Sequence, residues 1–385
     1  MIKRCDISED FTWYKKFVKP ETVMNIKTKI IKYALPFFTG ALILSGCSHE
    51  GGETQTETIQ SVSASSEAAK TDPATASFFA MDTVMELTAY GDNGQAAVTE
   101  GEELVGNIEK QLSTEIEESA VSKLNKNKSA VFEDDTRHLM ETALATGDMT
   151  NGAFNISIYP LMKEWGFISQ EYKVPDSETI KELLSNTDLS EIKINTDTNE
   201  IALENKDMEI DLGGIAKGYT SDSLINLFKE KGIKSGMVNL GGNVQLLGTK
   251  PNGSLWRVGI RSPYEDVDFL GILSASDVAV ITSGGYERYF EQDGNIYHHI
   301  MDPATGFPAD NGLVSVTVVS KDATLADALS TALYVMGKDK AIDFWRKHTD
   351  SFDMILMDNN DELYISEGIY DSFSSDTFAA HKITK

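Results

Sequence analysis

The sequence predicts an α+β fold, with mixed or antiparallel sheets flanked by helices. Segments with strand-like alternation and segments with helical periodicity are interspersed along the chain. They do not follow the regular strand–helix–strand order that builds a doubly wound parallel sheet. Glycines or turn-forming asparagines separate many of these segments, which is typical of helix ends and hairpin turns.

The order of the segments defines the expected elements. Helices are expected over five ranges, with Gly147 and Gly337 ending the second and fourth: 95–112, 136–146, 215–231, 325–336 and 339–347. Strands are expected over 78–90, 237–248, 256–260, 278–282, 296–301 and 313–319. Turn residues inside apolar alternation predict two hairpins, over 192–203 and 354–365.

The composition excludes one broad class of partner. The chain has 385 residues, of which 41% are hydrophobic, so it can bury a sizeable core. Its formal net charge is −26. A general nucleic-acid binder would show a basic excess instead, so we expect no nucleic-acid partner. The only cysteines, Cys5 and Cys47, allow neither a disulfide framework nor a zinc-type cysteine spacing.

The N-terminal region has the pattern of an export signal. A basic stretch over 24–32 precedes an apolar run over 33–44, which is too short to span a membrane stably. Leu44–Cys47 then resembles a bacterial lipobox, in which the cysteine is lipidated and becomes the first mature residue. Because this signal has its own methionine, Met24, we expect the true start there. An uncleaved membrane anchor is the alternative, but it needs a longer apolar run.

Three segments are therefore expected. Residues 1–46 are a leader plus a lipoprotein signal peptide, and 47–77 are the lipidated cysteine and a tether rich in Ser, Thr, Glu and Gln. Such a tether has too few large apolar residues to offset the entropy lost on ordering. Residues 78–385 are the folded domain. The expected location is extracytoplasmic, with the lipid as the only attachment to the membrane.

Two glycine-rich blocks are candidate binding sites. Asp211–Gly218 lies where a strand gives way to a helix, and free N–H groups at a helix start favour an anion. Lys217 adds a positive charge, and Asp211 can accept a hydrogen bond from a ligand. A tight turn without a ligand is an equal alternative. Asn239–Asn243 holds a glycine pair within a strand pattern, which indicates a bulge or a close approach of the backbone.

Two further blocks carry residues suited to catalysis. His298 and His299 are adjacent in a predicted strand, so their side chains point to opposite faces and only one can face a site. That histidine is either a general base or a polar residue with satisfied hydrogen bonds. Asp327 and Thr331 put two oxygen atoms at i and i+4 on one helix face, where they suit Mg²⁺ or are surface polar residues.

In combination, these motifs resemble those of the FAD:protein FMN transferases, the ApbE family. Seven blocks occur in the family's order between about residues 78 and 337. They are 81–83, 152–155 leading to 165–167, 211–218, 239–243, 282–289, 299–306 and 327–331. The resemblance implies an ApbE-like (T-fold-like) architecture. It also implies Mg²⁺-dependent transfer of FMN from FAD to a Ser or Thr hydroxyl of an exported flavoprotein or electron-transport subunit, with release of AMP.

The resemblance also implies roles for individual residues. FAD is expected to contact Met81, Glu115, Ala153, Phe154, Asn155, Asp211 and Lys217, with His298 and Thr324 as further contacts. Mg²⁺ is expected at Asp327, Thr331 and the backbone carbonyl of Gly214. His299 is the expected catalytic base, oriented by Asp302.

Two positions depart from the family pattern. Family members often carry aspartate at the position of Asn155 and an aromatic residue at the position of Glu115. An amide brings no charge, and a glutamate offers no stacking face for FAD. Two alternatives therefore stay open. One is a Mg²⁺-dependent FAD pyrophosphatase that yields FMN and AMP, and the other is a flavin-binding lipoprotein without catalysis.

Overall fold

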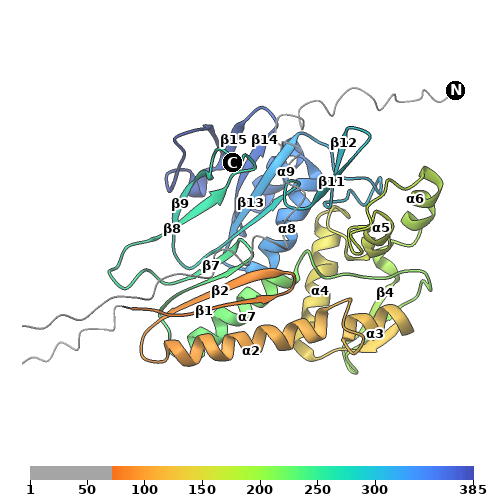
Figure 1. Cartoon of the computed structure of the whole chain (residues 1–385), viewed down its shortest axis with the longest axis horizontal. Helices are drawn as coiled ribbons and strands as arrows, with labels where there is room; N and C mark the ends of the chain where they lie inside the picture. Colours follow the sequence, from red (N-terminus) through yellow and green to blue (C-terminus); the bar gives the residue numbers. More distant parts are fainter. Residues whose placement is uncertain (1–71) are drawn as a thin grey trace, which may run out of the picture.

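The computed structural model describes residues 72–385, and Figure 1 shows their arrangement. The expected signal peptide, Cys47 and most of the expected tether lie outside the described residues. β1 (Ala74–Ala80) begins inside the segment expected to be tether, four residues before the expected start of the folded domain. No helix within the described residues is long and apolar enough to span a membrane.

A nine-stranded mixed sheet forms the centre of the fold. The strand order is β1-β2-β6-β7-β10-β13-β14-β15-β17, and only the pairing of β15 with β17 is parallel. After β1, these strands are β2 (Thr83–Tyr90), β6 (Ser235–Leu240), β7 (Asn243–Leu247), β10 (Ala279–Gly284), β13 (Leu313–Ser320), β14 (Asp353–Asp358), β15 (Glu362–Ser366) and β17 (Ala379–Ile383). The expected α+β class with mixed sheets is confirmed.

Both faces of this sheet are covered. The helices α2 (Gly94–Leu112), α7 (Ala216–Glu230), α8 (Ala323–Met336) and α9 (Lys338–Lys347) pack against one face. A small sheet of β8 (Trp256–Arg261), β9 (Phe269–Ala275) and β16 (Phe373–Ser374) packs on the other. All eight residues of β13 are buried, as expected for a strand covered on both sides.

The remaining elements build a second region beside the sheet (Figure 1). Its helices are α3 (Ala120–Asn127), α4 (Asp134–Met149), α5 (Tyr159–Glu164) and α6 (Ser177–Leu184), with 3₁₀ turns at Ile156–Ile158 and Leu189–Glu191. Its strands are β3 (Ser129–Val131), β4 (Ile192–Asn195), β5 (Glu200–Leu203), β11 (Tyr289–Gln292) and β12 (Asn295–His298). A short α10 (Glu367–Tyr370) follows β15.

Several elements differ from those expected. The segment 78–90 is a hairpin rather than one strand, because Met81 and Asp82 form a tight turn with φ of 47° and 59°. The segment 237–248 is also a hairpin, turning at Gly241 and Gly242 rather than bulging there. Gly241 does approach another chain segment closely: a Cβ would lie 2.2 Å from the Thr83 Oγ1.

One expected helix end is wrong. α4 continues through Gly147 to Met149. The glycine is needed for packing, because a Cβ there would lie 2.4 Å from the Leu189 Cδ1. The two expected hairpins over 192–203 and 354–365 are confirmed, as are the other four expected helices to within two residues at each end.

Candidate active site

The N-terminus of α7 is pressed against α8 at a glycine. A Cβ on Gly218 would lie 2.2 Å from the Ala323 carbonyl oxygen and 2.7 Å from the Asp327 Cβ, so no larger residue fits this contact. The close approach lets the Gly218 N–H donate a hydrogen bond to Asp327 Oδ2 at 2.8 Å. Asp327 Oδ1 accepts a second bond, from Asn243 Nδ2 at 3.0 Å. Three blocks that are far apart in sequence therefore meet at one carboxylate.

Asp327 is suited to holding a cation. Its side chain is almost fully buried, and no ion pair within residues 72–385 includes it. Burial raises the pKa of Asp327, and the nearby Lys217 charge opposes that rise. A buried carboxylate without a contacting cation is costly, so a bound metal ion would stabilise the charged form.

The other expected metal ligands are close to Asp327. Thr331 is one turn further along α8 on the same face, and its hydroxyl is 3.4 Å from the Ser283 hydroxyl. A Cβ on Gly214 would lie 4.0 Å from the Thr331 Oγ1, so the Gly214 backbone is adjacent. A carboxylate, a hydroxyl and a carbonyl form the all-oxygen donor set that suits Mg²⁺. Among the described residues, no group of three or more His, Cys, Asp or Glu side chains could hold a metal ion.

His299 has the tautomer of a general base. Its Nδ1 is 3.1 Å from the Arg288 carbonyl oxygen, and because a carbonyl only accepts, Nδ1 carries the proton. Nε2 then has a free lone pair, because no group within residues 72–385 donates a hydrogen bond to it. Burial among protein atoms, followed by the charge of Arg288, lowers the pKa of His299 well below its usual value. The ring is therefore neutral at physiological pH and can accept a proton.

His298 has a different environment. Its Nδ1 accepts from the Ile300 N–H at 3.2 Å, and its Nε2 donates to the Ala309 carbonyl at 3.1 Å. Its ring packs edge-on against Tyr334, and burial lowers its pKa to about 4. Both ring nitrogens are engaged within the protein, so His298 has none to offer the expected FAD contact. Of the two histidines, His299 is the partly exposed one.

Asp302 does not hold His299 as expected. Its carboxylate accepts from the Ala304 N–H at 2.9 Å and from the Thr305 hydroxyl at 3.3 Å. These bonds stabilise the turn after Met301, so the Asp302 carboxylate has a local structural role. The Arg288 carbonyl orients the His299 ring instead.

Charged groups surround the start of α7. Burial raises the pKa of Asp211, while the Gly213 N–H and the Arg288 charge oppose the rise. Burial also raises the pKa of Glu287, against the charges of Lys217 and two arginines. Sequence reasoning included Glu287 and Arg288 in the 282–289 block but assigned them no role. They directly precede β11, which pairs with the strand ending at His298. Because β11 was not among the expected strands, no local pattern indicated this position.

Three further expected FAD contacts lie against or beside α2, α7 and α8. The Met81 N–H donates to Glu109 Oε1 at 2.7 Å, and the Met81 sulfur accepts from the Thr220 hydroxyl of α7 at 3.8 Å. Glu115 is exposed just after α2. The Thr324 hydroxyl donates to Asp222 Oδ2 at 2.7 Å, so it is already engaged.

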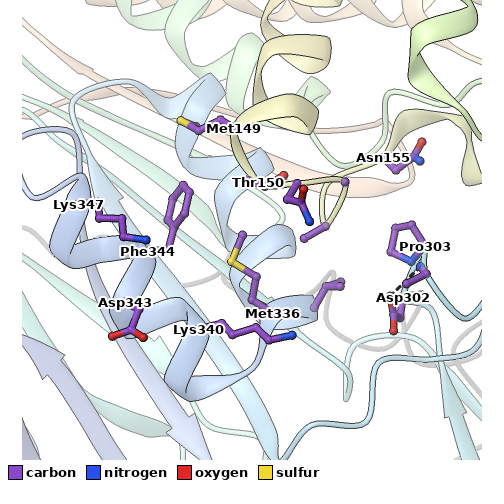
Figure 2. Close-up of a pocket in the computed structure, with 15 residues that line it drawn as sticks. Met149, Thr150, Asn155, Asp302, Pro303, Met336, Lys340, Asp343, Phe344 and Lys347 are labelled. Carbon is purple, nitrogen blue, oxygen red and sulfur yellow. Dashed lines mark hydrogen bonds between the residues drawn. The ribbon is translucent and has the colours of Figure 1, made fainter.

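The 153–155 segment borders a pocket of about 750 Å³ (Figure 2). Ala153, Asn155 and Asp302 line it, together with residues from the ends of α4 and α8 and from α9. Phe154 is buried with only 3% of its surface exposed. Asn155 Oδ1 accepts from Ser157, and its Nδ2 donates to the Thr187 carbonyl at 2.9 Å. The other expected site residues do not line this pocket.

The fold and the site bring together a glycine-rich helix start with Lys217, the buried carboxylate of Asp327 and a histidine with a free Nε2, an arrangement typical of an enzyme site. A family model described as the ApbE family matches residues 81–356. The chain therefore belongs to the ApbE family, the family of the flavin transferases.

Individual relatives agree with this assignment. An FAD:protein FMN transferase of Klebsiella pneumoniae is 37% identical over 59% of this chain and 70% of its own length. One of Treponema pallidum is 33% identical over 72% of this chain and 81% of its own. The crystal structure of the ApbE protein of Thermotoga maritima matches with a TM-score of 0.73 at 32% identity, over 77% of this chain and 98% of that one.

Proposed function

We propose that this chain transfers FMN from FAD to a Ser or Thr hydroxyl of an acceptor protein in a Mg²⁺-dependent reaction. The supporting observation is that a histidine with a free Nε2 and the buried carboxylate of Asp327 both lie within electrostatic range of Lys217 in the first turn of α7. Both curated relatives named above are called FAD:protein FMN transferases.

His299 accepts the proton in this mechanism. The acceptor hydroxyl oxygen forms a bond to the phosphorus on the FMN side of FAD as its proton passes to His299 Nε2. The phosphoanhydride bond breaks, and AMP leaves with the bridging oxygen. The products are phosphoester-linked FMN and AMP, so atoms and charges balance. The Arg288 carbonyl keeps the ring in the reactive tautomer throughout.

The start of α7 binds the pyrophosphate. Free N–H groups at a helix N-terminus favour an anion, and the Lys217 side chain adds a full positive charge. Asp327, Thr331 and the Gly214 carbonyl would hold Mg²⁺, which would offset charge on the phosphates and on the leaving AMP. Positioning and electrostatics carry most of the catalysis in phosphoryl transfer.

Hydrolysis of FAD is a second candidate. His299 is partly exposed to solvent, so water can take the place of the acceptor hydroxyl. The same residues would then release free FMN and AMP. A flavin carrier without catalysis is disfavoured, because it needs neither a histidine base nor an oxygen donor set.

The proposed location is the outer side of the cell membrane. The basic and apolar stretches before Cys47 support export and lipid attachment at that cysteine. A mature protein carrying acyl chains at Cys47, found by mass spectrometry, would support this. A mature protein that keeps residues 1–46 would contradict it.

Product analysis tests the activity. Purified protein lacking residues 1–47 is incubated with FAD and Mg²⁺, with and without a verified acceptor domain. AMP release that requires the acceptor, with an FMN-sized gain in acceptor mass, is expected. AMP release without acceptor would favour the pyrophosphatase. No AMP in either case, with FAD binding indifferent to Mg²⁺, would favour the carrier and overturn the proposal.

A further inference from the structure

An aromatic cluster lies next to the His299 ring. It is formed by Trp165, Phe167, Tyr172, Phe290, Tyr297 and Phe307. These residues come from the end of α5, the loop after it, the β11–β12 hairpin and the turn after Met301. All of them except Tyr172 belong to one separate hydrophobic core. Phe167 contacts the His299 ring edge-on, with 6.5 Å between ring centroids. The cluster therefore extends directly from the catalytic histidine.

Tyr172 is the exposed member of this cluster, with 42% of its surface accessible. Its ring stacks on Phe290 at 5.0 Å and 14°, and it meets Phe167 edge-on at 5.7 Å. One face of the tyrosine ring is thus covered by Phe290, and enough of the residue stays accessible to contact a ligand.

The backbone holds Tyr172 in this position. Gly166 has a φ of 81°, and a Cβ there would lie 2.1 Å from the Glu171 carbonyl oxygen and 2.8 Å from the Tyr172 Cα. The loop carrying Tyr172 therefore packs tightly on a glycine. A ring fixed by its backbone and by a stacked partner loses little entropy when it binds a second ring.

The chemistry of the proposed reaction determines whether the flavin or the adenine ring of FAD lies on the His299 side of the site. The attacked phosphorus carries FMN, and the leaving AMP lies in line on the side opposite to the attacking hydroxyl. His299 is next to that hydroxyl, so its neighbours face the FMN half of FAD rather than the adenosine half.

The expected FAD contacts offer the flavin no aromatic face. Phe154 and His298 are buried, and Glu115 has no ring. A large planar ring system such as isoalloxazine gains from an aromatic surface on which to stack. Tyr172 provides such a surface two ring contacts away from His299.

We propose that Tyr172 stacks on the isoalloxazine ring of the FMN half of FAD. This inference rests on the proposed function. Tyr172 lies outside the seven sequence blocks that resemble the ApbE family, in the loop between α5 and α6. It would determine specificity for the flavin half of FAD.

Binding of FMN and of AMP, each measured alone, tests this assignment. Fluorescence titration gives the Kd for FMN, and calorimetry gives the Kd for AMP. Tyr172→Ala and Tyr172→Leu are expected to weaken FMN binding about tenfold and to reduce the quenching of flavin fluorescence, with AMP binding unchanged. Tyr172→Phe is expected to remain within about twofold of the unaltered protein, because it keeps the ring.

Two controls separate stacking from folding. Tyr172→Ala could weaken FMN binding merely by loosening the loop. Tyr172→Leu keeps an apolar group over Phe290 and therefore preserves the fold, so it tests the loss of the ring alone. Phe269→Ala removes another exposed aromatic ring, on β9 in the small sheet, and should change neither Kd.

Three outcomes would overturn the assignment. Unchanged FMN binding in Tyr172→Leu would show that the ring is not a flavin contact. Weaker AMP binding with FMN unaffected would assign the ring to adenine. If the unaltered protein bound no FAD, the proposed function would fail and this inference with it.

Discussion

Replacing Gly218 with alanine tests how the two central helices form the site. The added Cβ would lie 2.2 Å from the Ala323 carbonyl oxygen and 2.7 Å from the Asp327 Cβ. Non-bonded heavy atoms prefer about 3.5–4.0 Å, so α7 and α8 must separate by about 1 Å or more. The 2.8 Å bond from the Gly218 N–H to Asp327 would then lengthen beyond hydrogen-bonding range.

Three contributions determine how much Gly218→Ala changes the free energy of unfolding. Overpacking costs about 1–3 kcal/mol, and loss of a hydrogen bond to a charged group costs about 1.5–3 kcal/mol. The higher helix propensity of alanine returns about 1 kcal/mol. We therefore expect Gly218→Ala to lower the free energy of unfolding by roughly 1.5–5 kcal/mol.

Urea denaturation measures this change, and a Mg²⁺ titration of AMP release measures the effect on Asp327. The variant should need more Mg²⁺ for half-maximal rate. Gly106→Ala is a matched control, because Gly106 is also inside a helix but has no atom within 4 Å of the added Cβ. This control should gain up to about 1 kcal/mol. If Gly218→Ala were as stable as Gly106→Ala with the same Mg²⁺ dependence, the helix contact would not position Asp327.

Three further predictions follow from the site. His299→Ala should bind FAD with nearly unchanged affinity but transfer FMN about 10²–10⁴-fold more slowly; normal transfer rates would make His299 structural. Asp327→Ala should abolish transfer and remove the response to added Mg²⁺, and near-normal turnover in this variant would contradict the metal assignment. His298 has a pKa of about 4 when folded and 6.5 when unfolded, so the unfolded state binds more protons between these values. Its contribution to stability is full above pH 6.5 and is lost as pH falls towards 4. Urea denaturation from pH 7 to 4 should show a smaller loss of stability in His298→Asn than in the unaltered protein. Equal losses would show that the pKa of His298 is not lowered by folding.

Local patterns predicted most of the helices and the two asparagine-containing hairpins. The turn at Met81 and Asp82 escaped prediction because it contains no glycine, although both residues have positive φ. Pairing along the whole length of β1 and β2 stabilises that turn, and such pairing is not a property of the turn sequence. Gly147 was predicted to end a helix for a related reason. A glycine at this point of the sequence is typical of a helix end, whereas in the fold it lies inside α4 and is required by its close contact with Leu189.

The order of motifs was sufficient to identify the family, because backbone approach, charge and oxygen ligands each require particular residue types at short spacings. It could not decide between His298 and His299. Strand alternation shows only that they point in opposite directions. Packing against Tyr334 and α8 buries His298, and the Arg288 carbonyl turns Nε2 of His299 into the free base.

The sequence by itself determined which residue types were available for the chemistry: a lysine at a glycine-rich helix start, an oxygen pair one helical turn apart, and a histidine pair. Only the tertiary structure decided how they meet. Gly218, Asn243 and Asp327 join through contacts that span 84 to 109 residues of sequence. Such contacts depend on the packing of α7 against α8 and on the register of β7, which are set by the whole core and by no local segment.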